Sequence, residues 1–434
     1  MKYYSTNHNS PDVSLAEAVV KGLAPDRGLY MPERIERLPR EFFENIDKMS
    51  FHEIACRVAR AFFGEDIPGA DLDAIVCDTL SFPTPVVEVE PGIYSLELFH
   101  GPTLAFKDVG ARFMARLLQY FIKRGDDRRN VHVLVATSGD AGSAVANGFL
   151  GVDGINVHVL YPKGKVSPIQ ECQFTTLGRN ITAIEVDGVF DDCQRLVKSA
   201  FLDSELNDRL LLTSANSINV ARFLPQAFYY FNAYAQLKKA GMADNLVVCV
   251  PSGNFGNITA GLIAHRMGLP IKRFIAANNA NDVFFKYLQD GKYEPRASIA
   301  TIANAMDVGD PSNFARILDL YGNDHARITS LISGTTYSDG LIAKTMEECF
   351  KDTGYILDPH GAVGYRALKQ SLRPGETGVF LETAHPAKFK DTVEAHIGCE
   401  VEIPSRLADF MKGEKQSVAM TSDFADFRSY LMTL

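Results

Sequence analysis

The pattern of apolar residues changes near Tyr94. Beyond it, short runs of apolar and often β-branched residues alternate with segments in which apolar residues recur at helical spacing. Helical patterns follow Gly142, Phe190, Ile218 and Asn257. The short runs predict six β-strands: Val131–Ala136, Val157–Leu160, Ile181–Val186, Leu246–Val250, Arg273–Ala277 and Gly378–Leu381. Strands separated by helices predict an α/β fold with right-handed crossovers and a largely parallel sheet.

The segment before this alternation has a different pattern. Leu15–Lys21 and Phe51–Phe63 have helical spacing, and turns with proline and glycine, such as Ala24–Gly28, lie between such helices. We expect a small α-rich cap here. In a parallel sheet, ligands bind at the carboxyl ends of strands, so the loops that follow the predicted strands are the places to look for chemistry.

Composition and charge narrow the class of protein. The chain has 434 residues, of which 46% are hydrophobic and 22% charged, as in an ordinary soluble globular protein of two or three domains. A formal net charge of −9 without a basic block argues against nucleic-acid binding. The sequence contains no run of about 18 consecutive apolar residues, so no membrane span is predicted. We therefore expect a small-molecule substrate, with no nucleic acid and no membrane.

The cysteines and the amino terminus point to a compartment. The seven cysteines are scattered without a close pair or a His/Cys cluster, which predicts neither a disulfide framework nor a metal site. The polar segment Met1–His8 lacks the apolar centre of a signal peptide. We expect a cytoplasmic protein with reduced thiols.

Lys107 is the first candidate for chemistry. It lies in the run His100–Asp108, directly before an amphipathic helix predicted over Val109–Arg124. The amino end of a helix carries partial positive charge, so an ammonium there is disfavoured and its pKa falls. A lysine that loses its proton readily is a nucleophile suited to a Schiff base with pyridoxal phosphate. The alternative is a lysine on the surface.

Two loops between a strand and a helix are suited to anions. They are Thr137–Gly142 and Ser252–Asn257, whose glycines and hydroxyls precede helices with free N–H groups. Neither loop contains the Gly-Lys-Ser/Thr ending of a triphosphate loop or the dinucleotide glycine pattern. Both are candidate cradles for phosphate or carboxylate, and the alternative is a plain turn.

Two further segments carry polar candidates. Glu382–Phe389 follows a predicted strand, and its Thr383 is placed to present a hydroxyl to a ring nitrogen; His385 and Lys388 are weaker candidates. Ser214–Arg222 leads into a helix, and the planar guanidinium of Arg222 suits phosphate unless it faces solvent.

These segments together resemble the threonine synthase family, whose members are pyridoxal-phosphate enzymes of the tryptophan-synthase-β-like fold (type II). Four motifs carry the resemblance in the family's order: Gly22–Pro32, Phe99–Asp108, Val250–Asn257 and Glu382–Phe389. Two positions depart from it. Ala141 replaces a hydroxyl residue, and Asn257 stands where some members have aspartate, although asparagine can still cap the helix.

The resemblance implies a fold and a reaction. The fold is two open, mostly parallel sheets with helices on both faces and a small N-terminal α-rich domain. The implied domains are residues 1–82 and a catalytic domain at 83–434, with a smaller mobile subdomain at about 131–215. The implied reaction converts O-phospho-L-homoserine and water to L-threonine and phosphate in a monomer or homodimer.

The resemblance also implies a set of site residues. Lys107 would bind pyridoxal phosphate as a Schiff base and move protons, without a metal. The residues implied for the cofactor are Lys107, Gly253, Asn254, Phe255, Gly256, Asn257 and Thr383. Those implied for the substrate are Thr137, Ser138, Gly139, Asp140, Gly142, Ser217, Asn219 and Arg222. Asp140 has two possible roles, at the ring's 3-hydroxyl or as a helix cap.

Two alternatives remain at this point. One is another enzyme of the same fold, such as a serine/threonine dehydratase or a phospholyase acting on amino phosphates. The other is a non-catalytic relative that keeps the fold for binding or regulation. The presence of Lys107 together with both anion loops argues against the second.

Overall fold

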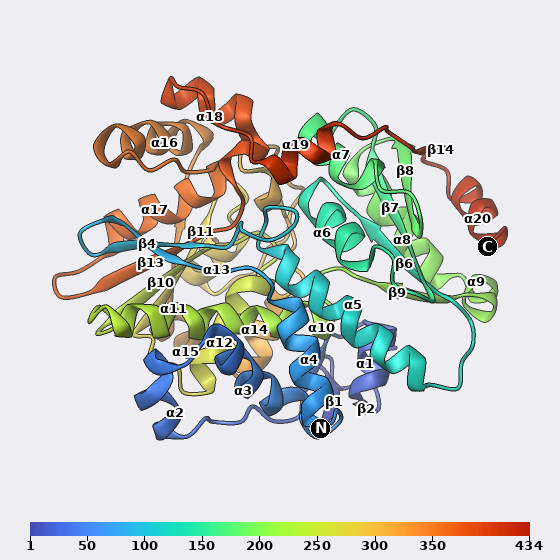
Figure 1. Cartoon of the computed structure of the whole chain (residues 1–434), viewed down its shortest axis with the longest axis horizontal. Coiled ribbons are helices and arrows are strands. Elements are labelled where there is room, and N and C mark those ends of the chain that lie inside the picture. Colours follow the sequence, from blue (N-terminus) through green and yellow to red (C-terminus); the bar gives the residue numbers. More distant parts are fainter.

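The computed structural model describes all 434 residues and contains two large sheets and one small sheet. The six-stranded sheet has the order β12-β11-β10-β13-β5-β4, and the five-stranded sheet has the order β14-β8-β7-β6-β9. In Figure 1 the six-stranded sheet occupies the left half of the molecule and the five-stranded sheet the right half. The active-site candidates of the sequence lie on loops from both sheets.

The six-stranded sheet is parallel except for the antiparallel pair β4 and β5. Its strands are β4 (Val86–Glu90), β5 (Ile93–Glu97), β10 (Leu246–Pro251), β11 (Arg273–Asn278), β12 (Ile332–Thr336) and β13 (Thr377–Glu382). Alternate residues face opposite sides, as the pleat requires. Val248 and Phe274 belong to the largest core cluster, whereas Val247 and Ile275 belong to a second cluster on the other face. Both faces are therefore covered.

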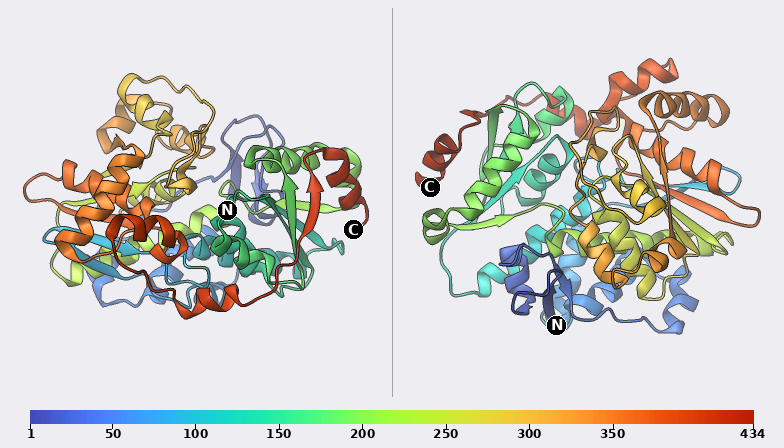
Figure 2. Two further views of the ribbon diagram at one scale, coloured as in Figure 1. Left: turned by 90° about the horizontal axis from the view of Figure 1, so that it is seen from above. Right: turned by 180° about the vertical axis from the view of Figure 1, so that it is seen from behind.

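The five-stranded sheet is parallel throughout. Its strands are β6 (Val131–Ala136), β7 (Ile155–Pro162), β8 (Ile181–Asp187), β9 (Leu211–Ser214) and β14 (Val418–Thr421). The edge strand β14 returns from the C-terminal end of the chain and pairs Val418 with Ile184. Figure 2 shows it in red beside the green strands.

Helices surround both sheets. They are α1 (Leu15–Lys21), α2 (Arg40–Asn45), α3 (Phe51–Phe63), α4 (Gly69–Thr79), α5 (Lys107–Arg124), α6 (Asp140–Phe149), α7 (Pro168–Thr175), α8 (Phe190–Leu202), α9 (Ser204–Arg209), α10 (Val220–Phe223), α11 (Ala227–Lys239), α12 (Gly256–Arg266), α13 (Val283–Asp290), α14 (Phe314–Leu320), α15 (His325–Leu331), α16 (Asp339–Thr353), α17 (Pro359–Ser371), α18 (Lys390–Ile397), α19 (Ser405–Met411) and α20 (Phe424–Met432). Short 3₁₀ segments are η1 (Ile46–Lys48), η2 (Leu224–Gln226), η3 (Asn304–Met306) and η4 (Pro386–Phe389). α17 packs on β10, β11 and β13, whereas α8 packs on β6 and β7.

The N-terminal residues combine helices with a small antiparallel sheet. Its strands are β1 (Lys2–Ser5), β2 (Val13–Ser14) and β3 (Tyr30–Pro32), in the order β2-β1-β3. The helix α3 packs on α11, and α4 packs on α5. Val58 and Phe63 belong to the same buried cluster as Phe113 and Phe228, so this region shares its core with the rest of the protein.

The predicted fold class is confirmed, and all six predicted strands are present as β6, β7, β8, β10, β11 and β13. The main difference concerns helix starts. α5 begins at Lys107 rather than Val109, α6 at Asp140, and α12 at Gly256. These first turns carry polar residues or glycine, which conceal the apolar spacing from which the helices were predicted. Lys107, Asp140 and Gly256, which were expected in the segments before helices, are therefore the first residues of helices.

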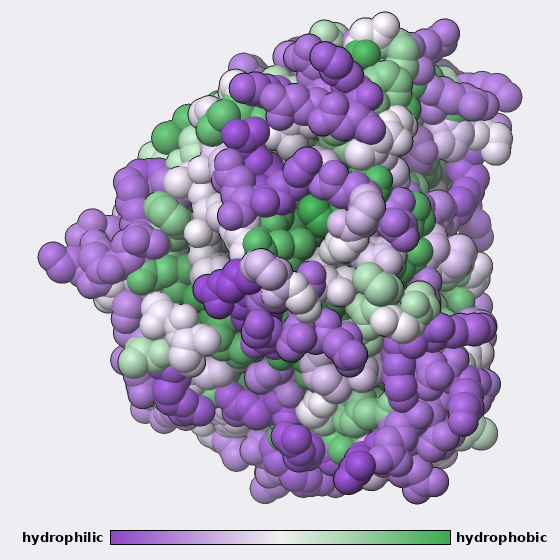
Figure 3. Space-filling view, turned by 90° about the vertical axis from the view of Figure 1, so that its left-hand side faces the viewer, coloured by the Kyte–Doolittle hydropathy of each residue, from purple (hydrophilic) through white to green (hydrophobic).

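The surface is mixed in character. On the side where α16 and α17 lie, hydrophilic residues cover most of the face, and apolar residues form separate small groups (Figure 3). No helix combines the length and the apolar character needed to cross a membrane.

Candidate active site

Lys107 is held where the end of β13 meets the start of α5. Leu104 has a left-handed backbone with φ of 62°, and its carbonyl accepts a hydrogen bond from the N–H of His385 at 3.0 Å. The carbonyl of Thr383 accepts one from the N–H of Phe106 at 2.8 Å. Ala105 forms a bridge with Ala384 between them. These contacts place the Lys107 segment beside the Thr383 segment, although the two are far apart in sequence.

A buried carboxylate fixes the turn before Lys107. The carboxylate of Asp108 accepts hydrogen bonds from the Thr103 N–H at 3.0 Å and from the Thr103 hydroxyl at 2.6 Å. A Cβ at Gly101 would lie 2.5 Å from this carboxylate, so glycine is needed there. Because the turn is closed by its own side chains, Lys107 begins the helix in a defined position.

The environment of Lys107 favours its neutral form. Its side chain is partly buried, so the alternative of a surface lysine is excluded. The pKa of Lys107 is lowered to about 8, mainly by desolvation on burial; the charge of Asp140 opposes this shift, and the charges of Arg222 and Lys388 add to it. The expected direction is therefore present, but it arises mainly from burial. Close to neutral pH, a useful fraction of this amine is unprotonated.

The loop Thr137–Gly142 closes on itself. The hydroxyl oxygen of Thr137 accepts hydrogen bonds from the N–H groups of Gly139 at 2.9 Å and Gly142 at 2.8 Å. Gly139 has a φ of 150°, and a Cβ there would lie 2.7 Å from the amide of Gln170. Ser138 is partly buried in the same loop. The first turn of α6 leaves further N–H groups open at this end of β6.

Asp140 and Lys388 form a buried ion pair next to this loop. Gln170 also donates to the Asp140 carboxylate at 3.2 Å, and the Lys388 ammonium donates to the carbonyl of Thr103 at 2.9 Å. Burial alone would raise the pKa of Asp140, but Lys388, Lys107 and Gln170 outweigh it and lower this pKa below its usual range. Asp140 is therefore an ionised partner of Lys388 in the first turn of α6.

The loop Ser252–Asn257 is tied to its surroundings instead. The side chain of Asn254 donates to the Ser217 hydroxyl and accepts from the Ser312 N–H at 2.7 Å. Phe255 has a left-handed φ of 65°. A Cβ at Gly253 would lie 2.8 Å from the carbonyl oxygen of Ala305, so packing alone requires glycine at this position. Ser217 and the loop therefore lie together.

The helix-capping role expected for Asn257 is wrong. α12 begins at Gly256, so Asn257 lies inside the helix, and its side-chain oxygen accepts from the hydroxyls of Tyr229 and Tyr230, both at 2.7 Å. The amide nitrogen Nδ2 of Asn257 is buried and has no hydrogen-bond partner in the protein. Buried donors are normally satisfied, so this one is available to a ligand oxygen.

Arg222 and Asn219 differ in what they offer. Arg222 is 3% exposed, which excludes the alternative of a solvent-facing arginine. Burial lowers its pKa to about 10, Nη1 donates to the carbonyl of Ala215, and Nε has no partner. Asn219 caps α10 and donates both amide hydrogens to the carbonyls of Val19 and Ser214. Asn219 therefore lacks a free donor, and the structure removes it from the substrate candidates.

Several residues at the site carried little signal in the sequence. Tyr229 and Tyr230 lie in a mostly apolar helix, and Gln170 lies outside all the motifs found in the sequence. Lys388 had a signal, because it belongs to the segment that follows β13, but nothing in the sequence shows that it is buried. Thr383 is also buried, and its hydroxyl makes no hydrogen bond within the protein.

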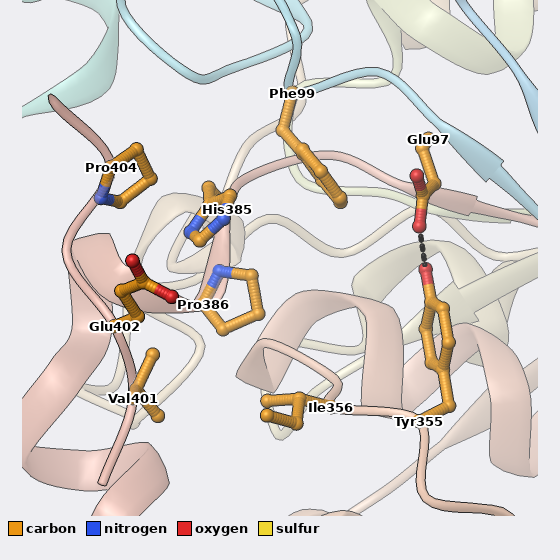
Figure 4. A pocket seen from close by; sticks show the side chains of 9 residues that line it. All are labelled: Glu97, Phe99, Tyr355, Ile356, His385, Pro386, Val401, Glu402 and Pro404. Carbon is orange, nitrogen blue, oxygen red and sulfur yellow. Dashed lines mark hydrogen bonds between the residues drawn. The ribbon is translucent and has the colours of Figure 1, made fainter. Parts of the chain in front are cut away.

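A cavity lies near this site, but Lys107 is not among the residues that line it. It has a volume of about 450 Å³, and His385, Phe99, Tyr355 and Glu97 are among the residues that line it (Figure 4). Glu97 accepts a hydrogen bond from the Tyr355 hydroxyl at 2.7 Å. Neither Lys107 nor any residue of the two anion loops lines this cavity, so it is separate from the candidate reaction site.

Two open sheets, a partly buried lysine with a lowered pKa and two loops suited to anions define a pyridoxal-phosphate-dependent enzyme of fold type II. Residues 79–383 match the family model described as "Pyridoxal-phosphate dependent enzyme". Residues 2–80 match "Threonine synthase N terminus", and residues 361–431 match "Threonine synthase, C-terminal". The chain belongs to the threonine synthase family.

Individual relatives agree over the full length. The chain is 46% identical to threonine synthase from Haemophilus influenzae over 100% of both chains. It is also 46% identical to that of Escherichia coli over 100% of this chain and 99% of the relative. The crystal structure of the Escherichia coli threonine synthase has a TM-score of 0.93 at 45% identity and covers 100% of both chains.

A second solved structure bears on the cofactor. The PLP-bound threonine synthase from Brucella melitensis has a TM-score of 0.93 at 36% identity and covers 100% of this chain and 99% of that one. Maize serine racemase, at 15% identity and a TM-score of 0.54, shares only the fold. Pyridoxal phosphate is the cofactor of this protein's family, and the free Nδ2 of Asn257 and the buried Lys107 fit it.

Proposed function

We propose that the protein converts O-phospho-L-homoserine and water to L-threonine and phosphate, as the last step of threonine biosynthesis. This is the reaction of a pyridoxal-phosphate-dependent lyase. The observation that carries the proposal is the position of Lys107: the residue before it is bonded to the Thr383 carbonyl, and the charges of Asp140, Arg222 and Lys388 act on its amine. One nucleophilic amine is thus combined with an excess of cations, as a dianionic substrate requires.

The cofactor half of the site is assigned to the six-stranded sheet. Lys107 would bind pyridoxal phosphate covalently, and Thr383 would present its free hydroxyl to the ring nitrogen. The phosphate group would lie against the loop Gly253–Asn257, where Asn257 has a buried donor without a partner. When bound, the cofactor withdraws electrons from the carbon atoms of the substrate.

Lys107 also supplies acid–base chemistry. Because burial lowers its pKa to about 8, the amine can both accept and donate a proton near neutral pH. We assign to it the proton transfers at the α, β and γ carbons of the substrate. A hydroxyl such as that of Thr383 holds a ring nitrogen without the full positive charge that a carboxylate would favour.

The substrate half is assigned to loops of the five-stranded sheet and to the segment after β9. Arg222 has a buried Nε without a partner, and Ser217, five positions earlier in the same segment, contacts Asn254. Together with Thr137–Gly142 they would receive the substrate phosphate and carboxylate. Ala141 offers no hydroxyl there, so its neighbours Ser138 and Thr137 have to supply the side-chain donors.

Two features of the whole protein complete the proposal. All seven cysteines are free thiols, which fits a reducing compartment such as the cytoplasm. No group of His, Cys, Asp and Glu side chains is arranged to hold a metal ion. We infer a small-molecule enzyme that acts as a monomer or homodimer.

The test is an assay of the purified protein with O-phospho-L-homoserine. We expect equal amounts of threonine and phosphate, and a visible absorbance band from the lysine-linked cofactor. Formation of 2-oxobutyrate without threonine would instead identify a dehydratase of the same fold. Absence of both the band and the products would support a non-catalytic relative.

A further inference from the structure

A second lysine, Lys388, is buried at the site, and it has no role in the reaction proposed above. The side chain of Lys388 is completely buried and pairs with Asp140. Its remaining hydrogen bond goes to the carbonyl of Thr103, in the turn that precedes Lys107. A fully buried lysine is rare and costs free energy unless its charge is compensated. Such a residue therefore calls for an explanation.

The pair joins the two halves of the protein. Asp140 begins α6 after strand β6 of the five-stranded sheet, whereas Lys388 lies in η4 after strand β13 of the six-stranded sheet. Gln173 of α7 donates to the same carbonyl of Thr103 at 3.1 Å. The pair and this carbonyl thus lie where both sheets meet, directly beside the start of α5.

The charges around Lys107 can be counted. Asp140 on α6 is the single carboxylate that acts directly on it, and Arg222 on α10 and Lys388 on η4 are the two cations. Asp108, on the same helix, is engaged by Thr103. The other titratable groups near Lys388 are neutral: burial lowers the pKa of His385 to about 4 and raises that of Cys172 to about 11. The net charge acting on the Lys107 amine therefore depends on whether Asp140 is paired with Lys388.

We propose that Lys388 is a positioning residue that holds the Asp140 carboxylate as its own partner and so prevents a stable ion pair between Asp140 and Lys107. The inference rests on the proposed role of Lys107. An amine held as an ammonium by a nearby carboxylate cannot act as a nucleophile. With Lys388 in place, the carboxylate is neutralised by a cation that does not react.

The physical reason is the low polarity of the site. A carboxylate taken out of water must find a cation, and besides Lys388 the amine whose charge acts on Asp140 is that of Lys107. An opposite charge within about 4–6 Å changes a pKa by roughly 1–3 units. Removing one member of the pair should therefore shift the proton affinity at Lys107, and the sign should depend on which member is removed.

The experiment follows the visible absorbance of the cofactor-loaded protein as a function of pH, because the band reports protonation of the Lys107 nitrogen. In Lys388→Met the midpoint should rise by about one pH unit, since Asp140 then stabilises the protonated form. In Asp140→Asn it should fall by a similar amount. The double variant should return close to the wild-type midpoint.

Two controls separate this role from structural damage. Lys388→Arg keeps the charge and should keep the wild-type midpoint. Lys390→Met removes a lysine two residues away, which pairs with Glu394 and donates to the carbonyl of Val401; it should leave the midpoint unchanged. If Lys388→Met fails to take up cofactor, the pH dependence of labelling of Lys107 by acetic anhydride, read by peptide mass, measures the same shift.

The outcomes are distinct. Midpoints of Lys388→Met and Asp140→Asn that stay at the wild-type value, or that move in the same direction, would overturn the inference. A wild-type protein that shows no cofactor band would instead contradict the assignment of Lys107. A melting temperature that falls in each single variant but recovers in the double variant would support the pairing itself.

Discussion

The two loops that sequence alone places in the same class are built in opposite ways. Thr137–Gly142 is closed by one of its own side chains, because the Thr137 oxygen accepts from two N–H groups of the loop. Ser252–Asn257 has no such internal bond to its side chains and is held from outside, through Asn254, by Ser217 and Ser312. The same strand-loop-helix pattern thus leaves different groups free.

Charge separates the two loops further. The first loop contains Asp140, which is ionised and paired with Lys388, whereas none of the six residues of the second is acidic. A permanently bound phosphate is disfavoured beside a carboxylate and favoured beside a buried donor without a partner, such as Asn257 Nδ2. The comparison supports the assignment of the cofactor phosphate to the second loop. The sequence pattern of the two glycine-containing loops does not by itself tell which of them binds the cofactor phosphate.

The largest expected effect concerns the residue between the two loops. Lys107→Ala should lose turnover by several orders of magnitude, because the covalent attachment and the proton transfers are lost together. Cofactor should still bind, without a covalent link, through the second loop. Borohydride reduction followed by peptide mass analysis checks this, and a reducible link at another lysine would contradict the assignment.

A matched pair of glycine variants tests the difference between the loops directly. A Cβ at Gly142 would lie 2.5 Å from Thr137 Cγ2, so Gly142→Ala should destabilise the fold by about 1–3 kcal/mol. At Gly256 the nearest atom would be 3.4 Å away, so Gly256→Ala should leave the stability of the cofactor-free protein almost unchanged. Its effect should appear in the cofactor dissociation constant.

Thermal unfolding and cofactor titration of both variants provide the measurements. If Gly256→Ala binds cofactor with wild-type affinity, the assignment of the cofactor phosphate to the second loop is contradicted. A stable Gly142→Ala with weakened cofactor binding would reverse the assignment of the two loops.

The next effect belongs to the substrate side. Arg222→Lys keeps a positive charge but loses the planar fork, so the Michaelis constant for O-phospho-L-homoserine should rise while the cofactor band stays unchanged. A charge-assisted hydrogen bond contributes roughly 1.5–3 kcal/mol, which corresponds to at least about tenfold in catalytic efficiency. Steady-state kinetics tests this. Wild-type efficiency in both Arg222→Lys and Arg222→Ala would leave the substrate phosphate without this partner.

The smallest expected effect is a pH dependence of folding stability that arises in the five-stranded sheet. In the five-stranded sheet that carries the first loop, His132 contacts His158 at 3.1 Å, and His158 contacts the Tyr430 hydroxyl of α20 at 2.8 Å. Burial lowers the pKa of His158 to about 3, so it stays neutral in the folded state while the unfolded chain takes up a proton below about pH 6.5. Stability from this residue is therefore present above the unfolded pKa and lost as the pH falls.

The expected loss is about 1 kcal/mol between pH 6.5 and pH 5.5, measured by denaturant unfolding. His158→Gln removes the titrating group, and its stability should vary less with pH over this interval. An identical pH dependence in the two proteins would assign the acid sensitivity to other groups.

The strands of the central sheets could be predicted because their signal is local. β6, β10 and β13 are buried along their whole length and consist mostly of apolar residues, as expected for strands covered on both faces. Five strands of the two large sheets were not predicted: β4, β5, β9, β12 and β14. Each has only four or five residues and at most three apolar residues in a row, so its local signal is weak. The small N-terminal sheet escaped prediction for a similar reason, because its strands have two to four residues.

For the site, sequence could nominate residue types but not their partners. Asn219 and Arg222 lie three positions apart in one polar segment, and both were plausible ligands. In the structure both amide hydrogens of Asn219 are donated to backbone carbonyls, whereas Nε of Arg222 has no hydrogen-bond partner. Which donor is free depends on where Val19 and Ser214 lie, and these contacts are absent from any local pattern.

The sequence by itself determined the alternation of strands and helices, the loops at strand ends, and the four motifs that indicate the family, because each depends on neighbouring residues. Only the tertiary structure decided that Asp140, Arg222 and Lys388 surround Lys107, and that Asp140 pairs with Lys388. Charges act over a few ångströms and are strengthened by the exclusion of water. The proton affinity of Lys107 is therefore set by residues that meet only when both sheets are assembled.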